Sequence, residues 1–515
     1  MRLSKDNIQK ITNDQVQKPA LDYFDLPEKV LQFGSGVLLR GLPDYYIDQA
    51  NKQNIFNGRI VVVKSTAAGD IDAFKEQDDL YTQVMRGIVN GKNVEKYIIN
   101  ASISRVLSAA NEWNKILDCA SNPQLSIIIS NTTEVGITLM DDRINGVPPV
   151  SFPGKLLAFL YRRFEHFKGD SSKGMVIIPT ELIPGNATAL KMILRQLAED
   201  NQMEPAFIDW LLNANSFCNS LVDRIVPGKL SPDLMKSFRG LMGYEDRLAF
   251  MSEIYGLWAI ETKDEKVKQI LSFQASGEGM VLAPDINIYR ELKLRLLNGS
   301  HTLTCGLAFL AGFTTVKQAM EDDVFETFIT RLMMNEIIPS ITTEQLDKEQ
   351  AIQFATSVLD RYRNPFMEHH WMSITLQYSS KMGMRVIPLF KSYIQRYGTV
   401  PPFMALGFAS WLLFMRSASE KDGKHVGERD GLAYPINDDQ AALLAQLWKK
   451  NNIDALVAEV LGAKGIWQED ISQLPGLADT VAEKLRLLIN AGPAEALRKH
   501  VSDLSIADNH SRETI

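Results

Sequence analysis

Four short apolar runs, rich in valine and isoleucine, alternate with helix-compatible segments in the first part of this 515-residue chain. Apolar runs of this length, without polar alternation, are typical of strands that are buried on both faces of a sheet. Helical patterns, such as those at 39–53 and 154–167, separate the runs. The alternation predicts an α/β domain built on a doubly wound parallel sheet. The predicted strands cover residues 30–33, 60–63, 125–129 and 175–178.

The rest of the chain, from about residue 285, is nearly all helix-periodic and shows no second set of alternating strands. Pro401-Pro402 and the polar stretch 417–438 are predicted breaks. A chain of 515 residues is too long for one ordinary hydrophobic core. We therefore predict an α/β domain over residues 1–285 and a mainly α-helical domain over 286–515. Helices in the second domain are expected at 400–415, 439–452 and 475–490.

The composition restricts the class of protein. Hydrophobic residues make up 45% of the chain and charged residues 23%, as in an ordinary soluble globular protein. The net charge of −7 gives no basic footprint for nucleic acid, although a few local cations can still bind an anionic substrate. No signal peptide is evident, and the apolar run 400–415 is too short to cross a bilayer. Three cysteines without metal-type spacing fit a reducing cytoplasm and predict no metal site.

A turn with two glycines follows the first predicted strand and precedes a helix. The dinucleotide fingerprint is Gly-x-Gly-x-x-Gly, and Leu39 stands in the place of its third glycine. Two glycines still permit a close approach of a pyrophosphate to the helix N-terminus, so this is either a nucleotide site or a structural turn. The end of the second strand selects NAD or NADP, and it offers the basic Lys64 and the acidic Asp70. The residues predicted to border a cofactor at the turn are Phe33, Gly34, Ser35, Gly36, Val37 and Leu38.

A second candidate site lies in the segment Lys293-Leu-Arg-Leu-Leu-Asn298-Gly-Ser-His301. At about 100° per residue of an α-helix, Asn298 lies about 140° from Lys293 and His301 about 80°, so the three side chains can face one cleft. An amine among leucine side chains is costly to keep charged, which favours a general base near neutral pH. The amide and the imidazole would then hold a substrate oxygen. The alternative is an amphipathic helix whose lysine lies in solvent.

The spacing Lys-x4-Asn-x2-His resembles the signature of the mannitol dehydrogenase family. The members of this family are zinc-independent enzymes that interconvert a secondary alcohol and a ketone with a nicotinamide cofactor. Further blocks that resemble the family begin at Gln77, Ser130, Asn219 and Arg361. The resemblance implies a Rossmann-like N-terminal domain that binds the cofactor and a helical domain that binds the substrate. It also implies that Lys293 is the acid/base, and that Asn298 and His301 position the reacting oxygen.

The resemblance extends the cofactor site. The family's form of the turn, Gly-x-Gly-x-Phe-x-Arg, also lacks the third glycine, and it implies that Arg40 lies near the cofactor phosphates. The block Ser130-Asn-Thr-Thr-Glu-Val-Gly-Ile, just past a predicted strand, implies that Asn131 and Thr132 line the same site. The residues at the end of the second strand leave the choice of cofactor open, and the resemblance to uronate reductases favours NAD.

Within the family, the blocks resemble the tagaturonate reductase branch, which implies the interconversion of D-tagaturonate and D-altronate. Polyol dehydrogenases have an asparagine that helps to bind the reacting oxygen at the position where this chain has Leu182. Glu181 lies beside that position, and either Asn186 or Asn298 would supply the missing amide. The alternatives are a fructuronate reductase, a mannitol dehydrogenase or, from another class, a non-catalytic nucleotide-binding protein.

A uronate carries a carboxylate, and a cation is expected to bind it. Lys381 and Arg385 are four residues apart and share a helix face, where they form either a carboxylate site or a solvated basic stripe. The adjacent Asp223 and Arg224 are expected to form a structural ion pair. The expected partner is a small sugar acid, and the sequence does not indicate the oligomeric state. The predicted carboxylate-binding residues are Arg363, His369, Lys381 and Arg385.

Overall fold

The computed structural model describes residues 1–65, 71–132, 136–144, 147–449 and 452–512 and divides the chain into two compact units. The first unit comprises Met1–Gly87 and Asn93–Ile286, and the second comprises Ile88–Lys92 and Asn287–Ile515. Among the described residues, no helix is long and apolar enough to cross a membrane.

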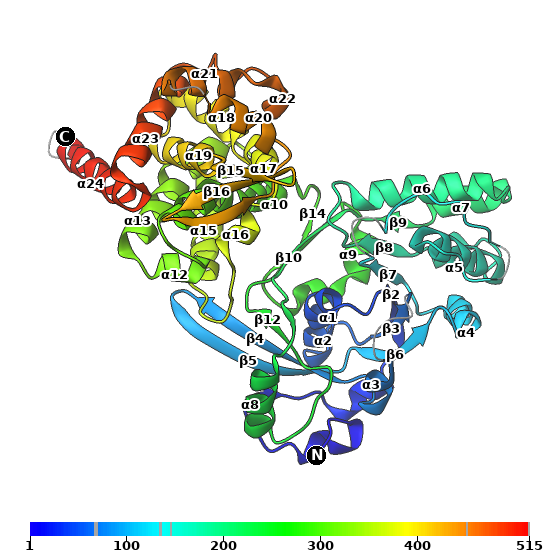
Figure 1. Cartoon of the computed structure of the whole chain (residues 1–515). Helices are drawn as coiled ribbons and strands as arrows, with labels where there is room; N and C mark the ends of the chain where they lie inside the picture. The colour runs from blue at the N-terminus through cyan, green and yellow to red at the C-terminus, as the bar shows by residue number, and fades with distance from the viewer. Residues whose placement is uncertain (66–70, 133–135, 145–146, 450–451, 513–515) are drawn as a thin grey trace. The chain divides into compact units, whose positions relative to one another are not determined.

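A six-stranded parallel sheet forms the centre of the first unit (Figure 1). In spatial order its strands are β6 (Ile103–Ser108), β3 (Arg59–Lys64), β2 (Glu28–Phe33), β7 (Ile127–Ser130), β8 (Val176–Pro179) and β9 (Ser216–Phe217). Every neighbouring pair is parallel. Numbered along the chain, the order is 3-2-1-4-5-6, which is that of the Rossmann dinucleotide-binding fold. The four predicted strands are confirmed as β2, β3, β7 and β8.

Helices and irregular segments accompany this sheet in the first unit. Two of the helices, α1 (Val37–Gly41) and α2 (Pro43–Lys52), follow β2 and together replace the single predicted helix at 39–53. The predicted helix at 154–167 is confirmed as α5 (Phe152–His166). The other helices are α3 (Ile71–Glu76), α4 (Trp113–Asp118), α6 (Asn186–Asp200), α7 (Pro205–Asn213), α8 (Pro232–Met242) and α9 (Glu265–Ile270), with the 3-10 helices η1 (Lys5–Lys10), η2 (Leu21–Asp25), η3 (Cys119–Ser121), η4 (Ser171–Lys173) and η5 (Ser272–Ser276).

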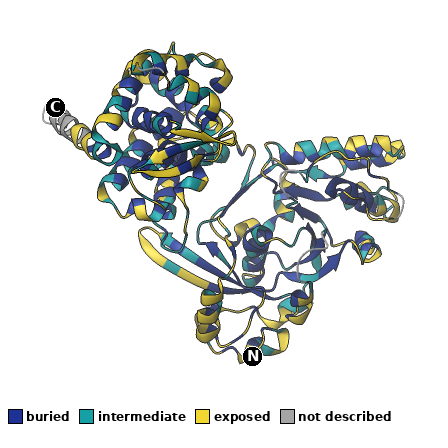
Figure 2. Cartoon of the chain, in the orientation of Figure 1, coloured by how far each residue is buried: buried dark blue, intermediate teal, exposed yellow. Residues whose placement is uncertain are grey.

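Two hydrophobic cores cover the two faces of the sheet, because successive residues of a strand point to opposite sides. In β2, Val30 belongs to a core with residues of α1 and α2, whereas Leu31 and Phe33 belong to a core with residues of α4 to α7. Figure 2 shows the buried strands in dark blue and the exposed outer side of α6 in yellow. Burial on both faces explains why these strands have uninterrupted apolar sequences.

The remaining strands before residue 286 form two smaller sheets, which the sequence did not predict. The five-stranded sheet contains, in order, β1 (Val16–Gln17), β5 (Lys92–Asn100), β4 (Tyr81–Val89), β12 (Phe250–Glu253) and β11 (Gly228–Lys229). The three-stranded sheet contains β10 (Ser220–Asp223), β13 (Leu257–Glu261) and β14 (Met280–Ala283). Asn90-Gly91 joins β4 to β5 with φ values of 51° and 73°. Asn-Gly is a hairpin signal because both residues tolerate positive φ.

Helices make up most of the second unit, as predicted. The predicted helix at 400–415 is confirmed as α19 (Pro402–Phe414), which is buried on all sides. Two segments, η6 (Leu292–Gly299) and η7 (Leu332–Ile337), are π-helices, in which each N–H bonds to the carbonyl five residues earlier. The α-helices at 439–452 and 475–490 are observed as α20 (Ala441–Leu447) and α23 (Leu477–Ala491). The others are α10 (Asn287–Glu291), α11 (Ser300–Leu310), α12 (Val316–Met320), α13 (Asp323–Arg331), α14 (Ile338–Ile341), α15 (Lys348–Tyr362), α16 (Trp371–Ile374), α17 (Tyr378–Arg385), α18 (Ile387–Tyr397), α21 (Ile453–Gly462), α22 (Lys464–Trp467) and α24 (Pro493–Arg512).

Residues 417–438, predicted only as a break between helices, contain three strands. There, β15 (Ser419–Lys421), β16 (Lys424–Arg429) and β17 (Leu432–Ile436) form an antiparallel sheet. Two-residue turns join the strands, and both are Asp-Gly pairs with positive φ at each residue. Asp-Gly favours a tight hairpin, so the residues interpreted only as breaks also specify strand pairing.

Candidate active site

Gly34 makes the tight turn at the end of β2 possible. Its φ of +124° is a conformation that residues with side chains rarely adopt. A Cβ atom on Gly34 would lie 2.9 Å from Leu39 Cδ1 and 3.0 Å from the Asn131 carbonyl oxygen. A Cβ atom on Gly36, by contrast, would meet no described atom within 4 Å. Gly34 is therefore needed for the turn itself, and Gly36 leaves open space beside the backbone.

The turn lies where the strand order of the sheet reverses. Because β2 pairs with both β3 and β7, Phe33 stands beside Val63 and Ser130 at the carboxyl ends of the strands. Dinucleotides bind in the crevice at such a switch point. The N–H of Asn131 donates to the Phe33 carbonyl at 3.1 Å, so the chain after β7 is held beside the glycine turn. Of the predicted cofactor residues, the structure brings to this edge Phe33, Gly34, Ser35, Gly36, Val37, Leu38, Asn131 and Thr132.

The two glycines lead to opposite predictions. Gly34→Ala is expected to lower the thermal unfolding midpoint, since it adds backbone strain and a close contact. Gly36→Ala is expected to leave that midpoint unchanged and to weaken NADH binding about tenfold, because the methyl group occupies the open space before the turn. Thermal unfolding and fluorescence titration with NADH measure the two effects. Unchanged NADH affinity in Gly36→Ala would show that the space is not used by the cofactor.

Arg40 does not lie where the sequence analysis placed it. It is only 5% exposed, and its guanidinium lies over the rings of Phe74, Tyr81 and Phe250 at 5.0–5.5 Å from their centroids. Its Nη1 donates to the Leu248 carbonyl at 3.1 Å. The prediction that Arg40 contacts the cofactor phosphates was wrong, because the arginine is directed into the core of the first unit.

The residues expected to select the cofactor are only partly described. Lys64 ends β3 and is 6% exposed, and its carbonyl accepts a hydrogen bond from the Ala109 N–H. Asp70 lies outside the described residues.

Two residues predicted to bind substrate are instead part of the framework of the first unit. The Asn186 amide is fully buried: its NH2 group lies within hydrogen-bond distance of the carbonyls of Pro179, Glu181 and Ser220, and its oxygen accepts two backbone N–H groups. The Glu181 carboxylate is 2% exposed and accepts hydrogen bonds from Ser130 and Thr132. Burial raises the pKa of Glu181, and these hydrogen bonds act against that rise. The substrate-binding predictions for both residues were wrong, because internal partners occupy their polar atoms.

The Lys-x4-Asn segment folds as a π-helix rather than the predicted α-helix. Lys293 and Asn298 both lie in η6, and His301 lies in the first turn of α11. In a π-helix, residues five apart are about one turn apart, so Lys293 and Asn298 lie on the same face and not about 140° apart. The Lys293 and Asn298 side chains are half-buried, whereas His301 is 8% exposed. The π-helix therefore aligns the amine and the amide.

His301 lies in a pocket of rings. Its imidazole stacks on Tyr362, with ring centroids 4.2 Å apart, and meets His369 and Trp371 edge-on at 5.2 and 6.0 Å. Burial holds the pKa of His301 well below its usual value, and the positive charge of neighbouring residues adds to this effect. The ring is therefore neutral at physiological pH. Its Nε2 is buried and has no hydrogen-bond partner among the described residues.

The predicted cations differ in what they already bind. Arg363 forms ion pairs with the carboxylates of Glu326 and Asp360, so its positive charge is neutralised within the second unit. Arg385 donates to Thr302 Oγ1 at 3.1 Å, and its buried Nε has no partner among the described residues. Burial lowers the pKa of Arg385.

Lys381 lies one helical turn before Arg385 on α17, and its ammonium donates to the Ile374 carbonyl at 2.8 Å. Burial and then the charge of Arg385 lower the pKa of Lys381. The charges of His369, Arg385 and Lys381 are among the causes that lower the pKa of His301. Of these three residues, His369 is in ring contact with the imidazole.

Family models match both parts of the chain. The mannitol dehydrogenase Rossmann domain matches residues 28–271, and the mannitol dehydrogenase C-terminal domain matches residues 285–489. The chain belongs to the mannitol dehydrogenase family. It is therefore an oxidoreductase, as the signature around Lys293 predicted.

Two curated relatives are altronate oxidoreductases. That of Bacillus subtilis is 38% identical over 483 residues, which cover 93% of this chain and 96% of that protein. That of Halalkalibacterium halodurans is 35% identical over 494 residues, which cover 94% of this chain and 95% of that protein.

Two solved structures share the fold. One is Pseudomonas fluorescens mannitol 2-dehydrogenase in a ternary complex with NAD and D-mannitol, with a TM-score of 0.66 and 21% identity, over 98% of this chain and 100% of that one. The other is a D-sorbitol dehydrogenase in substrate-free form, with a TM-score of 0.77 and 19% identity, over 96% of this chain and 100% of that one. The predicted order, a Rossmann domain followed by a mainly helical domain, is confirmed.

Sequence reasoning missed three contributors to the surroundings of His301. Tyr362 and Trp371 pack against the imidazole, and Arg361 is one of the charges that lower its pKa. The block that begins at Arg361 resembled the family, but no spacing rule connects it to a histidine 60 residues earlier. Arg224 donates to the carbonyls of Gly41, Ile254 and Tyr255, so its structural role includes bracing the backbone of the first unit.

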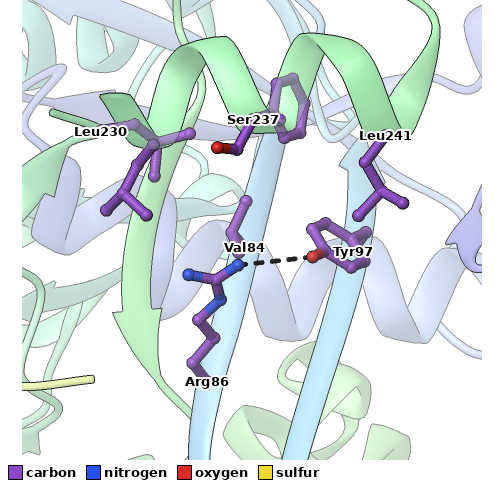
Figure 3. A pocket seen from close by; sticks show the side chains of 8 residues that line it. Val84, Arg86, Tyr97, Leu230, Ser237 and Leu241 are labelled. Carbon is purple, nitrogen blue, oxygen red and sulfur yellow. Dashed lines mark hydrogen bonds between the residues drawn. The ribbon is translucent and has the colours of Figure 1, made fainter. Parts of the chain in front are cut away.

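A small pocket in the first unit lies between β4, β5 and α8 (Figure 3). Arg86 and Tyr97 are its polar side chains together with Ser237, and Arg86 forms an ion pair with Glu95. The rest of the lining is apolar, and no residue of the glycine turn or of the Lys293 segment belongs to it. This pocket is therefore not part of the candidate site. Its lining residues are Val84, Arg86, Tyr97, Leu230, Leu234, Ser237, Phe238 and Leu241.

In the part of the chain that the structure describes, no three His, Cys, Asp or Glu side chains are grouped so as to hold a metal ion. The three cysteines are all buried and free.

Proposed function

We propose that this chain is an NAD-dependent oxidoreductase that interconverts D-tagaturonate and D-altronate with a lysine acid/base. The observation that carries the proposal is the alignment of Lys293 and Asn298 on one face of a π-helix, followed by a buried, neutral His301 with an unpartnered Nε2. The sugar-acid substrate is supported by the altronate oxidoreductases that are 35–38% identical over nearly the whole chain.

The first unit supports a dinucleotide cofactor. The switch point of the sheet, the tight turn at Gly34 and the open space at Gly36 are features that such a cofactor needs. Gly34, Ser35 and Gly36 would hold the pyrophosphate, with Asn131 and Thr132 beside them. When bound, NAD supplies the hydride acceptor and NADH the hydride donor. We propose NAD rather than NADP from the likeness to the altronate oxidoreductases.

The second unit supplies the proton and the hydrogen bonds. In the reduction direction, the Lys293 ammonium donates a proton to the ketone oxygen as hydride reaches the carbon. In the oxidation direction, the amine takes the proton of the hydroxyl group. The Asn298 amide and His301 Nε2 hold the oxygen on which negative charge develops, and a buried donor is effective there. These three groups polarise the carbonyl, so we propose that turnover is independent of a metal ion.

Arg385 and Lys381 are proposed to bind the carboxylate that distinguishes a uronate from a neutral ketose. Arg385 Nε is buried without a described partner, and a guanidinium matches a carboxylate with two parallel hydrogen bonds. Lys381 adds positive charge one turn away on the same helix. Arg363 is excluded from this role, because Glu326 and Asp360 already neutralise it.

The proposal is tested by following NADH consumption by the purified protein with tagaturonate, before and after treatment with a chelator. Rapid consumption that survives the chelator is expected, with NADPH a poorer reductant. Activity that disappears with the chelator and returns with zinc would contradict the lysine mechanism. Binding of NADH without turnover of any sugar acid would favour the non-catalytic alternative.

A further inference from the structure

Side-chain hydroxyls cover consecutive carbonyls at the end of η6. Ser300 Oγ lies 3.2 Å from the backbone oxygen of Leu297 and also contacts the backbone oxygen of Leu296. Thr302 Oγ1 donates to the backbone oxygen of Asn298 at 2.7 Å. Tyr362, the last residue of α15, donates to the Leu297 oxygen at 3.0 Å, and its own oxygen lies 2.8 Å from Ser300 Oγ. Three hydroxyls thus bond to the carbonyls in the last turn of the π-helix, which carries Asn298.

This turn needs such donors because the hydrogen-bond pattern changes there. N–H groups of a π-helix bond five residues back, and those of the following α-helix bond four residues back. Carbonyls at the junction that lose a regular partner must find another, since a buried carbonyl without one is costly. Serine and threonine often bond to the preceding turn of a helix, so Ser300 and Thr302 alone would not be distinctive. Tyr362 is distinctive because it comes from another helix.

Tyr362 supplies one of the two hydroxyl protons that face these carbonyls. Ser300 and Tyr362 each have one hydroxyl proton, and together they face two backbone carbonyls. The Leu297 carbonyl also accepts the backbone N–H of Ser300. Phenylalanine at position 362 would therefore leave the two carbonyls with one hydroxyl proton and that N–H. Tyr362 is 3% exposed, and burial raises the pKa of its phenol, so the group remains a donor throughout the physiological range.

Tyr362 also supports the imidazole. Its ring stacks on the imidazole of His301, which follows Asn298 in the chain, with an interplanar angle of 19°. Its hydroxyl donates to the backbone carbonyl of Leu297, which precedes Asn298. One side chain therefore connects the backbone of the π-helix to the position of the His301 ring. Arg385 reaches the same cluster through Thr302 Oγ1.

From these contacts we infer that Tyr362 is a positioning residue, whose hydroxyl holds η6 in its π register so that Lys293, Asn298 and His301 point at one substrate oxygen. The inference rests on the proposed function for its catalytic consequence, but the helical register can be observed without activity. Loss of the hydroxyl is expected to let residues 292–299 rewind towards an α-helix. Asn298 would then turn away from Lys293.

The test compares Tyr362→Phe with Tyr434→Phe. Tyr434 is a matched control, because it is a buried tyrosine of the second unit that stacks on a ring and donates to a backbone carbonyl, that of Phe414, at 2.8 Å. Crystal structures of both variants give the register of residues 292–299. Steady-state kinetics with tagaturonate, together with NADH titration and thermal unfolding, separate catalysis from binding and stability.

Tyr362→Phe is expected to lose the π register and to lower kcat by about 10- to 100-fold, since a displacement of about 1 Å at a catalytic group has effects of this size. Its NADH affinity should not change. Tyr434→Phe is expected to lose a similar amount of thermal stability and to keep both kcat and the register.

Retention of the π register in Tyr362→Phe would overturn the inference, whatever happens to kcat. An unchanged kcat in that variant, or an equal loss of kcat in Tyr434→Phe, would also overturn it. If the wild-type protein reduces no sugar acid, the proposed function fails, and the register seen in the crystal structure alone decides whether Tyr362 holds the helix.

Discussion

Lys293→Ala is expected to lower kcat for tagaturonate reduction by about 100- to 10,000-fold near neutral pH, the usual contribution of a general acid/base. The reason is that no other proton donor is proposed for the ketone oxygen, while Asn298 and His301 only hold it. NADH affinity should remain unchanged, because the residues proposed to hold the cofactor are those of the glycine turn with Asn131 and Thr132, and Lys293 is not among them. Steady-state kinetics and fluorescence titration with NADH measure the two quantities.

Lys391→Ala is the control for this variant. Lys391 lies in the same unit and forms an exposed ion pair with Glu469, so its loss should change neither kcat nor NADH affinity. A Lys293→Ala protein that keeps kcat within about twofold of the wild-type value would remove the lysine from the mechanism.

Arg385→Ala is expected to raise the KM for tagaturonate by about 10- to 100-fold, since hydrogen bonds to charged groups contribute about 1.5–3 kcal/mol. The KM for NADH should not change. Arg385→Lys should restore only part of the affinity, because lysine keeps the charge but loses the planar fork that bonds both carboxylate oxygens. Lys381→Ala should have a smaller effect, since its ammonium already donates to the Ile374 carbonyl.

Arg363→Ala separates carboxylate binding from structural pairing. It leaves Glu326 and Asp360 without their cation, so it is expected to lower the thermal unfolding midpoint and to leave the KM for tagaturonate unchanged. If Arg385→Ala and Arg363→Ala raise KM equally, neither arginine is specific for the carboxylate. An unchanged KM in Arg385→Ala would make Arg385 a structural residue.

The sequence was sufficient to predict four of the six strands of the main sheet, because these strands are buried on both faces. In such strands the requirement for apolar side chains is local, so β2, β3, β7 and β8 could be identified without knowing their partners. The hairpins were missed although their signals are also local. Asn90-Gly91, Asp422-Gly423 and Asp430-Gly431 each favour a two-residue turn, and the last two were interpreted as breaks alone.

The errors at the site came from long-range partners. Nothing near Arg40 in the sequence indicates the rings of Phe74 and Phe250 that enclose it, and nothing near Asn186 indicates the carbonyl of Ser220. Such contacts depend on the tertiary fold. Arg40 and Asn186 were therefore predicted to bind a ligand, whereas their side chains form hydrogen bonds inside the first unit.

The π register had a signal in the sequence that was not used. The five-residue spacing of Lys293 and Asn298 is one turn of a π-helix, and π-helical segments are frequent at functional sites. An α-helix would place these two side chains about 140° apart around the helix axis, whereas the π-helix places them on one face. The hydroxyls that hold the register come partly from Tyr362, and this contact across helices could not be read from the spacing.

The most direct test of the proposed function compares initial rates of NADH consumption with tagaturonate, fructuronate and fructose as substrates of the wild-type protein. We predict that kcat/KM is greatest for tagaturonate and exceeds that for fructose by at least about tenfold, because fructose lacks the carboxylate that Arg385 and Lys381 are proposed to bind. A kcat/KM for fructose equal to or above that for tagaturonate would contradict the assignment of a uronate substrate.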